Sequence, residues 1–318
     1  MTASAYVGRL APSPTGALHL GNVRTFMIAW LRARSVGGRV VLRTEDLDHP
    51  KDKPGAAAQA IADLEWLGFD WNEEYVQSER KSLYREALGE LRRLGLAYPC
   101  VCSRRDVEAA QSAPHAGEQL FYPGTCRGRF ADWESARRSM EGGRIPCWRF
   151  MTRPGSPVSF DDAFRGRFTE DVAATLGDFP LARDEGGAGY TLAVVVDDLL
   201  MGVTEVVRGD DLLAATPAQI LIAEALLPWA RKLLPSARPP AYCHVPLVVG
   251  PDGRRLAKRH GDTRIASYRE AGVRPEDVLG MLAASCGWCG PSESPSLGAL
   301  LPRFSLESIP KEPFVVRF

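Results

Sequence analysis

The sequence predicts an α/β fold of the doubly wound type, in which helices pack on both faces of a parallel β-sheet. Short continuous apolar runs, such as Val40-Val41-Leu42 and Tyr190–Val196, are typical of strands that a parallel sheet buries on both faces. These runs alternate with helical patterns, and polar residues follow where several of them end. Because open α/β sheets bind ligands at the carboxyl ends of their strands, we expect a ligand site there.

The N-terminal segment 9–22 predicts the end of a buried strand, a constrained turn and the start of a helix. Pro12 and Pro14 restrict the backbone, whereas Gly16 and Gly21 let it approach a ligand. A helix N-terminus that faces such a turn can hold phosphate. The helix is predicted from apolar residues at helical spacing, namely Val23, Phe26, Met27, Trp30 and Leu31.

After the strand Val40–Leu42, which leads into the polar segment Arg43–Asp48, the sequence predicts two more helices. The first has Pro54 in its first turn and an apolar face of Ala57, Ile61 and Leu64. The second ends before Gly95, and its apolar face consists of Leu83, Ala87, Leu88, Leu91 and Leu94. This order is that of the first half of a doubly wound domain.

The alternation stops between about residues 98 and 180, where the sequence is rich in Cys, Pro, Gly and Arg. This segment is predicted to be an insertion with short strands, such as Cys147–Met151. Strand–helix order then resumes with Tyr190–Val196, a strand expected to end at Asp197-Asp198. We therefore expect residues 1–97 and 181–262 to form the two halves of one Rossmann-like domain, and residues 263–318 to form a small helical region, too short for an independent nucleic-acid-binding domain of ordinary size.

Within the second half, two further strands and one helix are predicted. A strand over Val203–Val207 leads into Arg208, and another covers His244–Val249. Between them, Thr216 is expected to cap a helix that has Pro217 in its first turn.

Composition and charge indicate a globular protein of the cytoplasm. Lys plus Arg and Asp plus Glu both number 39 in 318 residues, so no overall positive field indicates nucleic acid, and RNA contact would need local patches. We expect no membrane contact, because the sequence has neither a signal peptide nor a run of about 18 apolar residues. The 7 cysteines are an odd number, which favours reduced or metal-bound thiols over a disulfide framework.

The N-terminal motif reads Arg9-Leu10-Ala11-Pro12-Ser13-Pro14-Thr15-Gly16-Ala17-Leu18-His19-Leu20-Gly21-Asn22. It resembles the first signature motif of class I glutamyl-tRNA synthetases, with Asn22 in place of the usual last His. A loop after His244–Val249 resembles the second signature, Lys-Met-Ser-Lys-Ser, although Ala257 lacks the hydroxyl. The residues of this second motif are Arg255, Leu256, Ala257, Lys258 and Arg259. The resemblance implies the catalytic core of a class I aminoacyl-tRNA synthetase, which is a ligase.

In such a ligase the carboxylate of an amino acid attacks the α-phosphorus of ATP, which gives an acyl-adenylate and pyrophosphate. Catalysis then depends on positioning and on donors aimed at growing negative charge. We expect His19 and Lys258 to be the catalytic donors, and Mg²⁺ to accompany ATP. The residues expected to bind ATP are Thr15, Gly16, His19, Gly21, Asn22, Asp210 and Lys258.

Charged residues near strand ends suggest an acidic amino acid as the substrate. Arg9 and Arg208 suit a side-chain carboxylate, and Glu45 suits the substrate ammonium group. The other interpretation is that Glu45 and Arg208 form a structural ion pair. The resemblance implies that glutamate is bound by Arg9, Leu10, Ala11, Pro12, Ser13, Glu45, Tyr190 and Arg208.

Cys100-x-Cys102 and Tyr122-x-x-x-Cys126 predict one structural zinc site with three thiolate ligands. The fourth ligand is open from chemistry alone, because His115 is the better zinc ligand by type; the resemblance favours Tyr122. Three reduced cysteines without metal are the alternative. A second pair, Cys286 and Cys289, has no partner pair, so we interpret it as packing rather than a redox site.

The resemblance extends from about Arg9 to Ser267, where a longer family member would continue into an anticodon-binding region. This length and the cysteine pattern favour a shortened subgroup, which activates glutamate without tRNA and transfers it to queuosine in the anticodon of tRNA(Asp). The partners would then be L-glutamate, ATP and tRNA(Asp) bearing queuosine, with the enzyme a monomer. The alternatives are a short synthetase that charges the 3′ end of tRNA and a catalytically silent RNA-binding paralogue.

Overall fold

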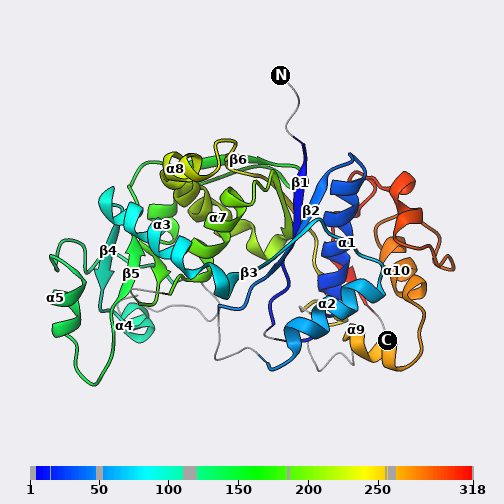
Figure 1. Cartoon of the computed structure of the whole chain (residues 1–318), viewed down its shortest axis with the longest axis horizontal. Coiled ribbons are helices and arrows are strands. Elements are labelled where there is room, and N and C mark those ends of the chain that lie inside the picture. The colour runs from blue at the N-terminus through cyan, green and yellow to red at the C-terminus, as the bar shows by residue number, and fades with distance from the viewer. Residues whose placement is uncertain are drawn as a thin grey trace.

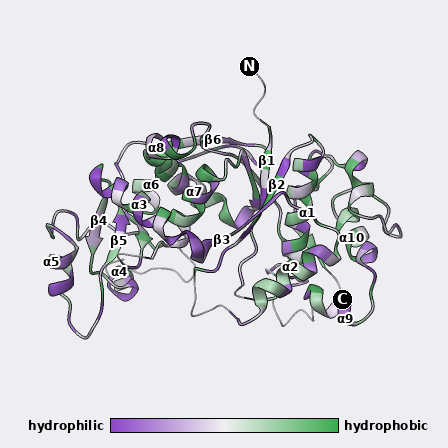
Figure 2. Ribbon diagram, viewed as in Figure 1, coloured by the Kyte–Doolittle hydropathy of each residue, from purple (hydrophilic) through white to green (hydrophobic). Residues whose placement is uncertain are grey.

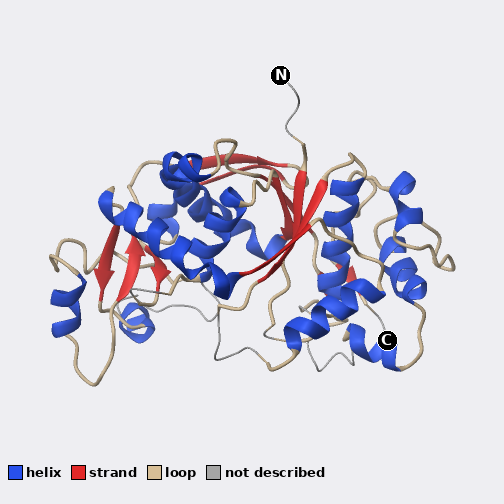
Figure 3. Cartoon of the chain, viewed as in Figure 1, coloured by secondary structure: helices blue, strands red, loops and turns tan. Residues whose placement is uncertain are grey.

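The computed structural model describes residues 5–14, 16–47, 53–109, 120–184, 187–254, 256 and 263–316. Two sheets form its centre (Figures 1 and 3). The first is parallel, in the order β1 (Val7–Leu10), β2 (Arg39–Thr44) and β3 (Glu73–Val76). The second has the order β7-β6-β10-β9, with strands Gly166–Glu170, Val158–Asp162, Ala241–Val245 and Glu205–Gly209. In this sheet β6, β10 and β9 are parallel, and β7 runs antiparallel to β6.

The two sheets meet where β1 lies beside β9. The backbone nitrogen of Thr204, just before β9, donates to the carbonyl of Val7 over 2.9 Å. From β1 the chain proceeds away from this contact to β2 and β3, and the strand on its other side comes from the second half of the sequence. This is a topological switch point, and the crevice beyond the carboxyl ends of two such strands is where α/β proteins bind ligands. The α/β prediction is confirmed.

Helices on the two sides of the sheets bury separate hydrophobic cores (Figure 2). The first core contains α1 (Leu20–Arg34), α2 (Ala56–Trp66), α9 (Ile265–Glu270) and α10 (Pro275–Ala284). The second contains α3 (Lys81–Arg93), α7 (Tyr190–Leu200) and α8 (Thr216–Leu233). The expected apolar face of α1 is confirmed, because Val23, Phe26, Met27, Trp30 and Leu31 are all buried. The structure thus packs α1 against the strands whose carboxyl ends face the crevice.

The prediction of a strand over Tyr190–Val196 was wrong, because this segment begins helix α7. Every residue from Leu192 to Leu199 is buried, so the helix has no polar face. Its sequence therefore lacks the 3.6-residue periodicity that would distinguish it from a buried strand. Asp197 and Asp198 do not end the element; they lie inside the helix, buried among charged partners.

Smaller corrections concern how helices begin and how one strand ends. Helix α2 begins at Ala56, after Gly55 with φ of 76°, so Pro54 precedes the helix rather than lying in it. The cap residue of α8 is Ala215, not Thr216, whose hydroxyl has other partners. The strand expected over 244–249 is two strands, β10 and the short β11 (Val248–Val249), which pairs with β12 (Phe314–Val315).

The segment 98–180 carries its own small antiparallel sheet, seen on the left of Figure 1. It pairs β4 (Ala97–Cys100), β5 (Cys147–Phe150) and β8 (Phe179–Ala182). The short helices nearby are α4 (Arg104–Ala109), α5 (Trp133–Arg138) and α6 (Val172–Thr175). The same segment also supplies β6 to the larger sheet, where Asp162 is in register with Tyr242. It therefore contributes a strand to the sheet beside the crevice.

Turns of 3-10 helix cover Gln77–Arg80, Asp210–Ala215 and Gly298–Arg303. The stretch Asp210–Leu233, which includes α8, has the length and hydropathy of a membrane span, but half of it is buried inside the protein. Because α8 packs against α3 and α7, its apolar residues are explained by the second core.

Candidate active site

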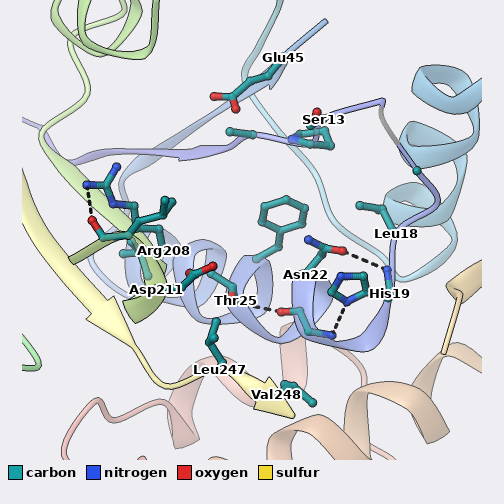
Figure 4. Close-up of a pocket in the computed structure, with 18 of the residues that line it drawn as sticks. Ser13, Leu18, His19, Asn22, Thr25, Glu45, Arg208, Asp211, Leu247 and Val248 are labelled. Atoms are coloured by element: carbon teal, nitrogen blue, oxygen red, sulfur yellow. Dashed lines mark hydrogen bonds between the residues drawn. The ribbon is translucent and has the colours of Figure 1, made fainter. Parts of the chain in front are cut away.

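A pocket of about 400 Å³ opens at the switch point, between the ends of β1 and β9 and the N-terminus of α1 (Figure 4). In this view Arg208 and His19 lie on opposite sides of it, and Glu45 lies at a third edge. Its lining includes most of the residues that the sequence assigns to the two substrates, namely Arg9, Ala11, Pro12, Ser13, Gly16, His19, Gly21, Asn22, Glu45, Tyr190 and Arg208. The pocket therefore joins residues that are about two hundred positions apart in sequence.

His19 caps helix α1 and holds the turn in place. Its Nδ1 accepts a hydrogen bond from the backbone nitrogen of Gly21 at 3.1 Å, and its own backbone nitrogen donates to Asn22 Oδ1 at 3.1 Å. This reciprocal arrangement is a capping box. A neutral ring that accepts at Nδ1 carries its proton on Nε2, so the cap fixes the tautomer of His19. Asn22, which replaces the usual histidine, completes this cap.

Arg9 and Glu45 lie on one side of the pocket and are both held by a buried ion-pair network. Glu45 Oε1 accepts from Arg43 Nη2 at 2.9 Å, and Arg43 Nη1 donates to Asp198 Oδ1 at 2.7 Å. Arg9 lies 3.8 Å from the same Asp198 oxygen and donates to the carbonyl of Val207 at 2.9 Å. Arg43 is fully buried. Arg43 and Asp198, which do not line the pocket themselves, thus hold the side chains of Arg9 and Glu45 in position.

Burial and charge act against each other in this network. Burial raises the pKa of Glu45, although Arg43 and Arg9 oppose the shift. Burial lowers the pKa of Arg9, whereas Asp198 counteracts it. For Arg43 the three neighbouring carboxylates outweigh burial and raise the pKa well above its usual value. Arg43 therefore carries a permanent charge that keeps Glu45 in place.

Arg208, by contrast, is held by neutral groups. Its Nε donates to His244 Nε2 at 2.9 Å, and its Nη2 donates to Thr216 Oγ1 at 2.7 Å. Its guanidinium also lies 5.5 Å from the centroid of the Tyr242 ring. Within the part of the chain that the structure describes, no carboxylate forms an ion pair with Arg208. The suggested structural pair between Glu45 and Arg208 is not formed, since Glu45 binds Arg43 instead.

Several residues assigned from the sequence lie elsewhere. Leu10 is fully buried in the first core and does not line the pocket. Asp210 is also absent from the lining, and its carboxylate pairs with Arg165. Leu256 is buried. Thr15 and most of the second motif, Arg255, Ala257, Lys258 and Arg259, lie outside the described residues.

Other residues of the pocket were missed by sequence reasoning. Thr25, Phe26, Asp211, Leu212, Leu247 and Val248 all line it. Thr25 and Phe26 lie one turn after Asn22 in α1, and Asp211 lies three residues after Arg208, so proximity in sequence was the available signal. Arg43 and Asp198, which support the pocket residues, could be noticed in the sequence only as charged residues that follow apolar runs.

The cysteine cluster forms a second candidate site, distant from the pocket in the small sheet. The sulfur atoms of Cys100, Cys102 and Cys126 all lie within 4.8 Å of one another. The hydroxyl of Tyr122 lies 3.2 Å from Cys100 Sγ and 3.7 Å from Cys102 Sγ, and it accepts from the backbone nitrogen of Cys126 at 2.9 Å. Three sulfurs and one oxygen thus converge on one point. His115 lies outside the described residues.

The surroundings of this cluster suit a bound cation. The hydrogen bond with Cys100, together with burial, raises the pKa of Cys126 to about 12, so without a cation the thiol keeps its proton. Arg149 donates to Cys100 Sγ at 3.2 Å and lies 3.8 Å from the centroid of the Tyr122 ring. Its charge would offset part of the negative charge of several thiolates. Cys286 and Cys289 lie at the end of α10, where Cys286 is buried in the first core.

Comparisons with known proteins agree with this geometry. The family model described as "tRNA synthetases class I (E and Q), catalytic domain" matches residues 6–293. The chain is 48% identical to a glutamyl-Q tRNA(Asp) synthetase from Symbiobacterium thermophilum, over 96% of this chain and 94% of that protein. It is 39% identical to a glutamate–tRNA ligase from a Hydrogenobaculum species, over 88% of this chain but 58% of that protein.

Solved structures lead to the same group. A glutamate tRNA ligase from Elizabethkingia meningosepticum, crystallised in complex with its amino acid, has a TM-score of 0.80 and 27% identity to this chain. The match covers 98% of this chain and 67% of that one. The backbone described above is therefore shared with a ligase whose structure contains its amino acid.

Proposed function

Because the chain belongs to the glutamyl-Q tRNA(Asp) synthetases, within the class I synthetase family for glutamate and glutamine, we propose that it activates L-glutamate with ATP and transfers it to queuosine in the anticodon of tRNA(Asp). In the first step an oxygen of the glutamate carboxylate bonds to the α-phosphorus of ATP, and pyrophosphate leaves. In the second step the acyl group moves to queuosine, and AMP leaves.

One observation carries the choice of glutamate: the guanidinium of Arg208 faces the pocket, and its hydrogen-bond partners among the described residues are all neutral. A side-chain carboxylate supplies the charge that this group lacks, whereas the neutral amide of glutamine does not. Arg9 and Glu45 would bind the rest of the amino acid, with Glu45 facing the ammonium group. Their pairing with Asp198 and Arg43 holds them in position before the substrate arrives.

ATP would bind at the other side of the pocket, on the capped N-terminus of α1. The backbone nitrogens of the first turn and the Nε2 of His19 are suited to phosphate oxygens. Lys258, which the second motif assigns to the leaving pyrophosphate, follows β11 in the sequence and lies outside the described residues. Mg²⁺ accompanies ATP in this family and would be held largely by the phosphates and water.

The cysteine cluster would hold one structural zinc ion through Cys100, Cys102, Cys126 and Tyr122. Zinc prefers a tetrahedral set of thiolate and nitrogen or oxygen ligands, and the convergence of three sulfurs with the Tyr122 hydroxyl fits that set. When bound, the ion would stabilise the loops between β4 and β5. We also propose that the enzyme acts as a monomer in the cytoplasm.

The deciding experiment identifies the acceptor. Radiolabelled glutamate is supplied with ATP and either tRNA(Asp) bearing queuosine, tRNA(Asp) without it, or tRNA(Glu). We expect label only on tRNA(Asp) that contains queuosine, and glutamate-dependent pyrophosphate exchange without any tRNA. Label on tRNA(Glu) would instead identify a synthetase for the 3′ end, and no exchange would indicate a silent paralogue.

A further inference from the structure

A line of buried polar side chains leads away from Arg208 across three neighbouring strands. Arg208 lies in β9, His244 in β10 and Asp162 at the end of β6. His244 and Arg208 are in register. All three side chains are buried, and His244 is fully so. Neither His244 nor Asp162 has been given a role in the function proposed above.

The distances assign the direction of each hydrogen bond along this line. Asp162 Oδ2 lies 2.6 Å from His244 Nδ1, and His244 Nε2 lies 2.9 Å from Arg208 Nε. An arginine nitrogen can only donate and a carboxylate can only accept. His244 must therefore carry its proton on Nδ1 and accept at Nε2. The other tautomer would place two donors against each other on one side and two acceptors on the other.

Asp162 is itself held rigidly by the backbone. Its Oδ1 accepts from the backbone nitrogens of Phe164 and Arg165 at 3.0 and 2.7 Å, and the backbone nitrogen of His244 lies 3.1 Å from both Oδ1 and Oδ2. Because the first two donors occupy Oδ1, the other oxygen is the one that faces the histidine ring. The hydrogen bonds to its oxygens lower the pKa of Asp162 against the opposing effect of burial, so it stays an acceptor.

We propose that Asp162 and His244 are positioning residues that hold Arg208 for the side-chain carboxylate of glutamate. This inference rests on the proposed function. Asp162 selects the tautomer of His244, and His244 then binds Arg208 without neutralising it. A carboxylate in place of His244 would bind the guanidinium as strongly, but would compete with the substrate for its charge. A neutral acceptor fixes the orientation of Arg208 and leaves its charge for glutamate.

The test uses Asp162→Asn, which changes almost no volume. Because the backbone nitrogens of Phe164 and Arg165 face Oδ1 alone, the new amide oxygen should stay at that position, and the amide nitrogen should take the other one and donate to His244 Nδ1. The proton of His244 then moves to Nε2, opposite Arg208. We expect the KM for glutamate in pyrophosphate exchange to rise about 10- to 100-fold, the effect of losing one hydrogen bond to a charged group, while the KM for ATP is unchanged.

Two substitutions of His244 provide a matched pair. The side-chain oxygen of His244→Gln reaches about as far as Nε2 and retains an acceptor for Arg208, whereas that of His244→Asn reaches only to Nδ1. We expect the glutamine variant to keep a glutamate KM close to wild type and the asparagine variant to resemble Asp162→Asn. Equal effects in both would indicate a purely structural role for the ring.

A direct readout is the ¹⁵N NMR spectrum of the histidine rings, which distinguishes the two tautomers. We expect an unprotonated Nε2 for His244 in the wild-type protein and a protonated one in Asp162→Asn. A protonated Nε2 in the wild type, or a folded Asp162→Asn with unchanged glutamate KM, would overturn the inference. The spectrum does not depend on activity, so it tests the tautomer separately from the proposed function. Absence of glutamate-dependent exchange in the wild type would refute the proposed function.

Discussion

The pocket and the cysteine cluster are built in opposite ways. The cluster takes its side chains from one short segment, residues 100–126, and its atoms converge on a single point. The pocket takes Arg9, Glu45 and Arg208 from three strands or strand ends, and each is held by residues behind it. The cluster would be stabilised by the ion it binds, whereas the pocket is stabilised before the substrate arrives. A substitution in one region should therefore leave the binding properties of the other unchanged.

The largest effect should follow from Arg208→Gln. Removing the guanidinium leaves the side-chain carboxylate of glutamate without a charged partner in a partly buried site, which costs about 2 to 5 kcal/mol in binding and activation. We expect glutamate-dependent pyrophosphate exchange to fall accordingly, while ATP affinity and metal content stay at wild-type levels. Retention of normal glutamate activation would show that Arg208 does not bind the substrate carboxylate.

The next effect concerns the other region, through Cys126→Ser. Loss of one thiolate should release the ion, and an ion present at about 100 times its Kd contributes about 2.7 kcal/mol of stability. We expect less than one zinc per chain by metal analysis and a lower unfolding free energy in urea. The KM for glutamate of the folded variant should not change. A variant that retains zinc and full stability would contradict the assignment.

Tyr122→Phe sharpens the same comparison, because it removes one oxygen and keeps the ring beside Arg149. The backbone nitrogen of Cys126 loses its acceptor, which costs about 1 to 3 kcal/mol when the donor is buried. Zinc should dissociate more readily to a chelator. His115→Ala is the control that addresses the ligand left open by chemistry, and it should retain zinc as the wild type does. The reverse result would make His115 the fourth ligand.

The two regions also differ in how far the sequence could predict them. The three thiols of the cluster follow from their spacing, because Cys100-x-Cys102 is a local pattern and Cys126 lies nearby in sequence, whereas Tyr122 was chosen from the resemblance. The turn before α1 was equally readable, since prolines, glycines and a capping residue act within a few positions. Arg208 was identified because it lies at the end of an apolar strand and matches a family position. Each of these signals is contained in a short stretch of chain.

What could not be predicted depends on the arrangement of distant elements. Helix α7 is buried along nearly its whole length, so its apolar run resembles a strand of a parallel sheet. The contact between Arg208 and His244 requires the register of β9 and β10, which no pattern in either strand reveals. Asp198 reads as the polar end of an element, although it lies in a helix and binds Arg43.

The smallest expected effect is the contribution of His244, on the pocket side, to the dependence of stability on pH. Burial lowers the pKa of His244 below its ordinary value of 6.5; the charges of Arg208 and Arg9 act in the same direction, and Asp162 opposes them. The folded protein then binds fewer protons than the unfolded chain below about pH 6.5, so the unfolding free energy should fall as the pH drops through this range. Urea unfolding at pH 7.5 and 5.5 measures this loss. His244→Gln should lose less stability between these two pH values than the wild type, and the difference should persist in a Cys126→Ser background, where protonation of the zinc ligands no longer contributes. Equal losses in the wild type and His244→Gln would mean that the ring titrates alike in the folded and unfolded chain.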